Sequence, residues 1–283
     1  MPDTLTLTSA ADGQALSALR WSAEGPIRGQ VLVAHGMGEH AGRYAPFAQA
    51  LAAQGFLVLA PDHRGHGHSI GPGGPGDFGS GGWEALVADM AQWLESFETT
   101  VPTVLFGHSM GSLAAQQYAC ERDEHLAGLI LSGSTCFDLL PVPEEGPAGL
   151  AAFNAAFEPA RTDFDWLSAD ADQVDRYIAD PLCGFDAAPD AMAGMFAAAA
   201  RIATPAALGG LRADLPVLLL AGDADPLNAG GTLIEALADR WRDAGVERVD
   251  VRRHAQGRHE MLNETNRGEV ITEVVNWIKF CAA

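Results

Sequence analysis

A serine stands between two glycines in the stretch GHSMG, residues 107–111, directly after the apolar run VPTVLF and directly before SLAAQQYAC. This pattern is typical of a nucleophile elbow, a strained turn from a strand into a helix that lifts a serine hydroxyl above the edge of a sheet. Gly107 and Gly111 suit such a turn, because larger side chains would collide where strand and helix converge. The same five residues also fit an ordinary tight turn. Ser109 is therefore a candidate nucleophile that needs partners elsewhere in the chain.

Those partners are a base and an acid, because serine is a weak nucleophile at neutral pH. For an elbow of this kind, the expected order along the chain is serine, acid, histidine. The stretch PVLLLAGDADPLN offers Asp223 and Asp225 just beyond an apolar run, and one of the two can be a simple turn residue. The stretch VRRHAQGRHEMLNE offers His254 at a strand end and His259 in the loop before the last helix. The loop position favours His259 as the base, although a solvated polar loop would look similar.

A third requirement is a pair of N–H donors for the negative oxygen that forms when serine attacks a carbonyl. HGMGEH, residues 35–40 and here called the donor turn, follows the apolar run QVLVA. Its Met37 backbone N–H can point into the site, and the N–H of Met110 can join it from the start of the helix after the serine. Each such donor lowers the barrier by on the order of 3 kcal/mol. We predict these two amides as the substrate-binding groups.

Two further polar stretches are interpreted as structural. DHRGHGHS, residues 62–69, holds three histidines and an aspartate. Their spacing is not that of an i, i+4 helical pair and no cysteine lies nearby, so we expect a turn here and no metal site. Glu39, His40 and Arg43, within and after the donor turn, are expected to fix its shape.

The elements that must position these groups alternate along the chain. Continuous apolar runs bounded by Gly, Pro or His predict buried parallel strands at 30–35, 56–61, 103–107, 128–133 and 216–222. Apolar residues at helical spacing predict amphipathic helices at 41–54, 81–97 and 269–280. Alternation of this kind predicts an α/β protein with a mostly parallel central sheet and helices on both faces.

Residues 141–211 break this alternation, because they contain many Ala, Phe, Met, Asp and Pro residues but no convincing strand. We predict a helical cap, or lid, over the edge of the sheet where open α/β folds bind ligands. The core would then comprise residues 1–140 and 212–283. Apolar cap side chains such as Met195 and Phe196 could line a pocket or pack one cap helix on another.

Composition limits the possible partners. With 283 residues, of which 48% are hydrophobic, the chain can bury a large core. A net charge of -20 makes nucleic acid and anionic membrane surfaces unfavourable partners. No signal-peptide pattern and no unbroken apolar stretch long enough for a membrane span are visible. Four scattered cysteines without C-x-x-C spacing are typical of reduced thiols, so we expect a cytoplasmic protein. The sequence gives no indication of the oligomeric state.

Five stretches together resemble a known family: HGMGEHAGRYAPFAQAL, PDHRGHGHS, GHSMGS, AGDADPLN and GRHEMLNE. They are similar to the α/β-hydrolase fold and, within it, to serine hydrolases of the monoacylglycerol lipase and lysophospholipase-like (serine aminopeptidase S33) type. The likeness covers nearly the whole chain and weakens only in 141–211. It implies Asp225 as the acid, since the family pattern G-x-x-D ends there, and His259 as the base, since H-E-x-x-N-E begins there. It also implies the Met37 and Met110 amides as oxyanion donors.

The resemblance implies a carboxylic ester hydrolase that works through an acyl-enzyme on Ser109 without a cofactor. Monoacylglycerols, lysophospholipids or other single-chain esters are the substrates it suggests. A serine peptidase of the prolyl type is an alternative, although HGMGEH lacks the proline that those enzymes carry in HGGPG. A cofactor-free perhydrolase and a slow-turnover ligand-binding homologue are the others. Dehalogenases and most epoxide hydrolases carry aspartate at the elbow, which Ser109 argues against.

Overall fold

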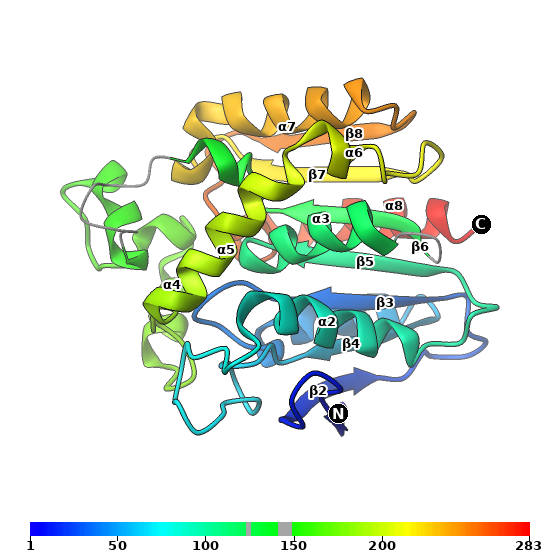
Figure 1. Ribbon diagram of the computed structural model, residues 1–283. Coiled ribbons are helices and arrows are strands. Elements are labelled where there is room, and N and C mark those ends of the chain that lie inside the picture. The colour runs from blue at the N-terminus through cyan, green and yellow to red at the C-terminus, as the bar shows by residue number, and fades with distance from the viewer. Residues whose placement is uncertain (123–125, 141–148) are drawn as a thin grey trace.

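The computed structural model describes residues 1–122, 126–140 and 149–283. Its centre is one eight-stranded sheet with the order β1-β2-β4-β3-β5-β6-β7-β8 (Figure 1). All neighbours from β4 to β8 pair in parallel, whereas β1 and β2 are antiparallel additions at one edge. The expectation of a mostly parallel sheet is confirmed.

The strands are β1 (Asp3–Thr8), β2 (Ala15–Trp21), β3 (Gly29–Ala34), β4 (Phe56–Pro61), β5 (Thr103–His108), β6 (Leu126–Ser132), β7 (Val217–Gly222) and β8 (Val249–His254). The α-helices are α1 (Ala45–Ala52), α2 (Gly82–Glu95), α3 (Met110–Arg122), α4 (Ala171–Ala179), α5 (Pro189–Ile202), α6 (Pro205–Leu208), α7 (Thr232–Asp243) and α8 (Arg267–Cys281). Short 3-10 helices are η1 (Ala41–Tyr44), η2 (Phe137–Leu139), η3 (Leu150–Phe157), η4 (Asp165–Leu167), η5 (Pro226–Gly231) and η6 (Met261–Asn263).

Helices cover both faces of the sheet, which explains the continuous apolar runs of its central strands. Successive strand residues point to opposite faces. In β3, Val31 and Val33 enter the core beneath α1 and α8, whereas Leu32 and Ala34 enter the core beneath α2, α3 and α7. Because both faces are buried, such a strand is apolar along most of its length.

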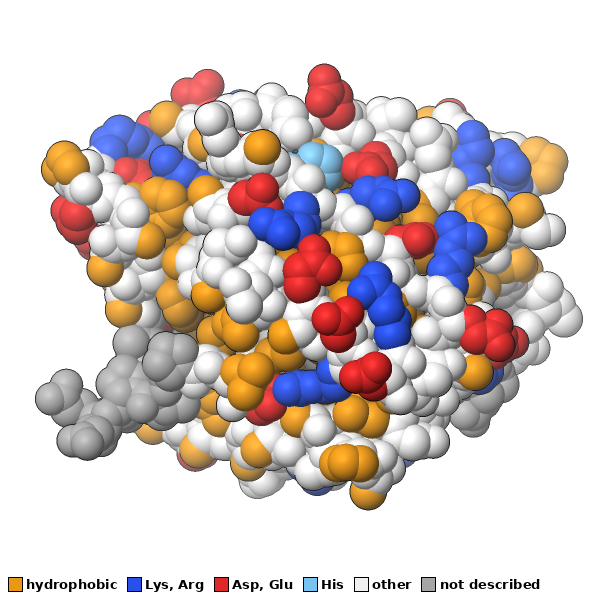
Figure 2. Space-filling model, turned by 90° about the horizontal axis from the view of Figure 1, so that it is seen from above, with side chains coloured by type: hydrophobic (Ala, Val, Ile, Leu, Met, Phe, Trp, Pro, Cys, Tyr) orange, Lys and Arg blue, Asp and Glu red, His pale blue; other side chains and the backbone are white. Residues whose placement is uncertain are grey.

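The edge strands follow a different pattern. β1 reads DTLTLT and is mostly exposed, and β8 reads VDVRRH with two exposed arginines. Figure 2 looks down on the α7–β8 end, where basic and acidic side chains are interspersed. Arg252 pairs with Glu273 at 3.0 Å and Arg253 with Asp223 at 2.7 Å. Charges of this kind discourage another chain from adding a strand to the open edge of β8.

The described part of the segment between β6 and β7 contains η2, η3, η4, α4, α5 and α6, joined by turns and coil, and no strand. η3 and α4 lie past the carboxyl ends of the strands, whereas α5 crosses in front of α2 and α3 (Figure 1). Met195 on α5 is 6% exposed and belongs to the core shared with α2 and α3, so this side chain packs the helix onto the sheet layer. Residues 141–148, the first part of the predicted cap, lie outside the described residues. No described helix combines the length and apolar character needed to cross a bilayer.

Candidate active site

Ser109 occupies a strained turn between β5 and α3. Its φ is +51°, in the left-handed region, which costs a residue with a side chain about 1–2 kcal/mol. A Cβ on Gly107 would lie 2.6 Å from the Gly111 carbonyl oxygen, and one on Gly111 would lie 2.3 Å from that of Ala34. Both glycines are therefore required by contact with backbone atoms. The Ser109 N–H donates to Ser132 O at 2.9 Å, which ties the turn to β6.

An imidazole and a carboxylate form a buried pair beside this turn. His259 Nδ1 lies 2.9 Å from Asp225 Oδ2, and their side chains are 2% and 0% exposed. The Leu227 N–H and the Asn228 side-chain amide also donate to Asp225, at 2.9 and 3.2 Å. Since the Nδ1 proton is directed at the carboxylate, the Nε2 lone pair is free to accept a proton. That nitrogen is buried and has no hydrogen-bond partner among the described residues.

The His259 ring lies against the residue that precedes Ser109. The His108 and His259 ring centroids are 4.8 Å apart. Burial and the neighbouring His259 lower the pKa of His108 to about 4, so His108 stays neutral at physiological pH. Burial also acts to lower the pKa of His259, but the charge and hydrogen bond of Asp225 outweigh it, with smaller contributions from Glu260 and Glu39. The pKa of His259 therefore lies above its ordinary value.

Asp223 and His254, the alternative acid and base, have other partners. Asp223 pairs with Arg253 at 2.7 Å on the exposed side of the sheet edge. His254 Nε2 lies 3.3 Å from a carboxylate oxygen of Glu273 on α8. Among the four candidates, the structure brings Asp225 and His259 together and directs Asp223 and His254 elsewhere.

The donor turn is held on several sides. The Gly36 N–H donates to Glu39 Oε1 at 2.6 Å, and Gly38 adopts a φ of +65°. The Gly38 carbonyl accepts from the Tyr177 hydroxyl at 2.8 Å. Met37 is half-buried in this turn, and Met110 is 1% exposed at the first position of α3, where an N–H has no partner within the helix. The tight approach of Gly111 to the end of β3 brings the start of α3 against the donor turn.

A buried ion-pair network joins the donor turn to the His259 loop. Arg43 donates to Glu39 Oε2 at 2.7 Å and to both oxygens of Glu260, at 2.5 and 2.6 Å. The Tyr44 hydroxyl also donates to Glu39. Burial alone would raise the pKa of Glu39, but Arg43, two nearby histidines and the Gly36 N–H hold it at about 2. Glu260 follows His259 directly, so the network fixes donors and base relative to each other.

An apolar cover lies over the base. The Trp166 and His259 ring centroids are 4.8 Å apart, and the Glu260 N–H donates to Leu167 O at 2.8 Å. Trp166 belongs to a larger apolar cluster, here called the apolar cover, whose members are buried or half-buried: Leu150, Phe153, Phe157, Phe164, Trp166, Leu167, Tyr177, Cys183 and Leu227. The sequence patterns did not indicate Trp166, because its partner is distant along the chain.

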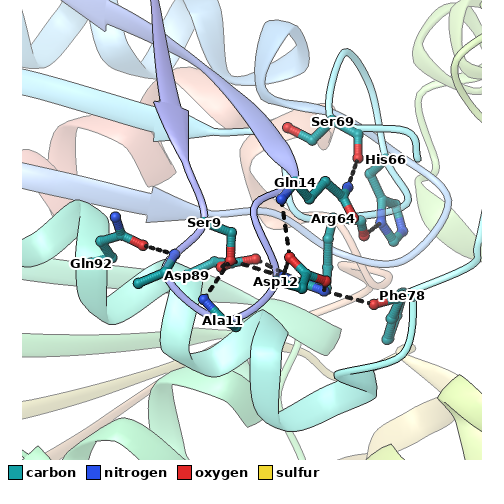
Figure 3. A network of polar contacts seen from close by, with 12 residues as sticks. Ser9, Ala11, Asp12, Gln14, Arg64, His66, Ser69, Phe78, Asp89 and Gln92 are labelled. Carbon is teal, nitrogen blue, oxygen red and sulfur yellow. Dashed lines mark hydrogen bonds and ion pairs between the residues drawn. The ribbon is translucent and has the colours of Figure 1, made fainter. Parts of the chain in front are cut away.

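The histidine-rich turn 62–69 supports the site from behind. The His63 N–H donates to His35 Nε2 at 2.9 Å, so that His35 Nδ1 carries the proton and donates to Gly36 O at 2.7 Å. Arg64 is fully buried and donates to Asp89 at 2.7 Å and to Asp12 at 2.9 Å (Figure 3). Figure 3 shows Arg64 in contact with residues of the β1–β2 turn, of α2 and of the loop that follows it. These contacts tie the turn to the donor turn, the β1–β2 turn and α2.

Comparisons with known proteins cover nearly the whole chain. The family model described as serine aminopeptidase, S33, matches residues 25–266. The chain is 30% identical to a monoacylglycerol lipase of Mycolicibacterium smegmatis, over 91% of this chain and 90% of the relative. It is 32% identical to the monoglyceride lipase of Mus musculus, over 95% and 88%. A thermostable carboxyl esterase from Bacillus coagulans superposes with a TM-score of 0.87 at 26% identity, covering 100% and 99% of the two chains.

Proposed function

We propose an ester-hydrolysing reaction for this chain, which belongs to the serine aminopeptidase S33 family and has the α/β-hydrolase fold. The relatives reported above are named monoacylglycerol lipase, monoglyceride lipase and carboxyl esterase. The substrates that we propose are therefore monoacylglycerols and similar single-chain esters. One observation carries the proposal. A buried His259–Asp225 pair, with its Nε2 unpartnered among the described residues, packs against His108, the residue before the strained Ser109.

The reaction proceeds through an acyl-enzyme. His259 Nε2 takes the proton of Ser109 Oγ while the oxygen attacks the ester carbonyl, and Asp225 holds the imidazole and stabilises its charged form. The backbone amides of Met37 and Met110 stabilise the oxyanion of the tetrahedral intermediate. His259 then protonates the leaving alcohol. In the second half, His259 activates a water molecule that releases the fatty acid and restores the serine.

We further propose that residues 141–211 form a cap that shields this reaction, on a core of residues 1–140 and 212–283. The contact of Trp166 with His259 and the apolar cover around it support this division. α5 belongs to the same segment, although it packs on α2 and α3. A cytoplasmic location is part of the proposal and is supported by four free thiols, all in described parts of the chain.

The peptidase, perhydrolase and slow-turnover alternatives are not favoured, since the relatives are named lipases and esterases. Hydrolysis of p-nitrophenyl esters of graded chain length separates the peptidase and the slow-turnover homologue from the proposed activity. We expect turnover with medium or long acyl chains to exceed that with acetate, because each buried methylene contributes about 0.8 kcal/mol. Turnover of peptide substrates alone would contradict the proposal.

The nucleophile is tested by Ser109→Ala. We expect turnover to fall by several orders of magnitude with unchanged thermal unfolding, and a fluorophosphonate probe to label native protein but not the variant. Ser112→Ala is the matched control, since this hydroxyl lies one turn into α3 and donates to Ser109 O. Equal labelling of native protein and Ser109→Ala would rule out Ser109 as the nucleophile.

A further inference from the structure

Three side chains with metal-binding atoms converge where the chain after α4 meets the donor turn. The ligand atoms of His40, Asp180 and Cys183 all lie within 4.8 Å of one another. His40 Nε2 is 3.0 Å from Asp180 Oδ2. All three side chains are half-buried, so an ion from solvent can reach them while part of its surroundings is already protein. Within residues 1–122, 126–140 and 149–283, no other cluster of three such side chains meets this geometry.

The backbone of residues 180–184 holds two of these ligands in place. The Leu182 N–H donates to Asp180 Oδ1 at 2.9 Å, which leaves Oδ2 facing the imidazole. The Cys183 N–H donates to Asp180 O at 3.0 Å and so fixes the spacing of the two residues. The Gly184 N–H donates to Gly38 O at 2.9 Å, which anchors this turn on the donor turn. Ligands oriented by such outer contacts lose little freedom when an ion binds.

One imidazole nitrogen, one carboxylate oxygen and one sulfur form a donor set suited to zinc. Zinc accepts all three atom types in tetrahedral sites and often keeps water as a fourth ligand. Magnesium and calcium prefer oxygen alone and are disfavoured by this set. We propose that His40, Asp180 and Cys183 bind a zinc ion, with a water molecule completing the site.

Binding requires two proton movements. The Cys183 thiol releases its proton to solvent and becomes the thiolate ligand. His40 binds through Nε2, so its proton moves to Nδ1 and the 3.2 Å hydrogen bond from the Gly42 N–H to Nδ1 is lost. Burial raises the pKa of Cys183, which works against the first step. Arg43 acts to lower the pKa of Cys183, and its own charge is balanced by two carboxylates.

The ion would act as a clasp between the segment after α4 and the donor turn. His40 comes from the loop after β3, whereas Asp180 and Cys183 come from the proposed cap. Anything that binds the folded chain and not the unfolded chain stabilises it, so the midpoint of thermal unfolding should rise with zinc concentration. The site is tested by metal binding and thermal unfolding, so its test does not depend on ester hydrolysis.

Cobalt(II) titration of untagged protein tests the site, because cobalt substitutes for zinc and is visible spectroscopically. We expect one ion per chain, a near-ultraviolet thiolate-to-cobalt charge-transfer band, and loss of that band when zinc is added. Cys183→Ser should lose the band, and Asp180→Asn should weaken binding. Cys281→Ser is the matched control, since this thiol is also half-buried but lies on α8.

The outcomes are distinct. A band in native protein and Cys281→Ser that is absent from Cys183→Ser supports the site, as does a zinc-dependent rise in unfolding temperature with the same pattern. The absence of a band in native protein overturns the proposal, and so does a band that survives in Cys183→Ser. Thermal unfolding without metal shows whether Cys183→Ser is folded. If it is not, Asp180→Asn must weaken cobalt binding, and unchanged binding overturns the proposal.

Discussion

Arg43 separates two buried carboxylates, and its removal should destabilise the protein strongly. The Arg43 side chain is 11% exposed, and those of Glu39 and Glu260 are 3% and 6% exposed. Arg43→Met keeps a flexible apolar stem but leaves both carboxylates without their cation. Removing one partner of a buried ion pair costs about 3–5 kcal/mol, and we expect the free energy of unfolding to fall by about this amount.

Two companion variants sharpen the expectation. Arg43→Met combined with Glu260→Gln removes one of the stranded charges and should be more stable than Arg43→Met alone. The coupling between neighbouring residues of this kind is about 0.5–3 kcal/mol. Arg43→Lys keeps the charge but cannot contact both Glu260 oxygens in the same way, so it should lie between native protein and Arg43→Met.

Activity should also fall, because the network fixes the donor turn relative to His259. A displacement of about 1 Å can cost about 10²-fold in rate, so kcat/KM of Arg43→Lys should fall by up to about this factor while the protein remains folded. Urea unfolding followed by tryptophan fluorescence gives the stability, and ester hydrolysis gives kcat/KM. Arg122→Met is the control, since Arg122 pairs with Glu95 at 4.0 Å on the exposed surface and should change stability by less than about 0.5 kcal/mol. A loss below about 1 kcal/mol for Arg43→Met, or a double variant no more stable than the single one, would refute the reasoning.

Asp225→Asn should lower kcat by roughly 10⁴-fold, whereas Asp223→Asn should cost far less; a larger loss at Asp223, measured on the same ester, would reverse the assignment. The pKa of His259 is raised, and only its neutral form accepts a proton, so kcat/KM should rise with pH around a midpoint above 6.5. Asp225 and Glu260 hold this midpoint up and His108 faces the same ring, so a pH–rate profile with its midpoint below 6.5 would contradict the geometry. Gly111→Ala would place a Cβ 2.3 Å from a backbone oxygen and should prevent stable folding, which expression and circular dichroism would reveal. Gly268→Ala, on a helix with open space around it, should leave stability unchanged or raise it by up to about 1 kcal/mol.

The central strands were predictable because their environment is uniform. Val31 and Leu32 enter different cores, yet both cores demand apolar side chains, so the run of residues is unmistakable. β1 and β2 were not predicted. β1 alternates, so its pattern resembles that of a polar loop, and in β2 Ser17 and Arg20 interrupt the apolar residues. The serine turn was also predictable, since its strain and its two glycines are determined within five residues.

Contacts between distant residues were not predictable in the same way. Arg43 and Glu260 are 217 residues apart, and His40 and Asp180 are 140 apart. Nothing in the local spacing of either pair indicates its partner, because only the folded sheet and the segment after α4 bring them together. Trp166 over His259 belongs to the same class, and it lies in the segment where the family resemblance is weakest.

Trp166 lies on η4 and covers His259, so the position of η4 determines whether water reaches the base. While η4 is seated, an indole covers His259 and water is kept from the imidazole, so its attraction to Asp225 acts through a medium of low polarity. If η4 lifts, water surrounds the ring and screens that attraction. The same change would remove the burial that acts to lower the pKa of His259, so its two effects on the proton of the imidazole oppose each other. The seat of one short helix would thus set both the hydration of the base and the strength of its pairing with Asp225.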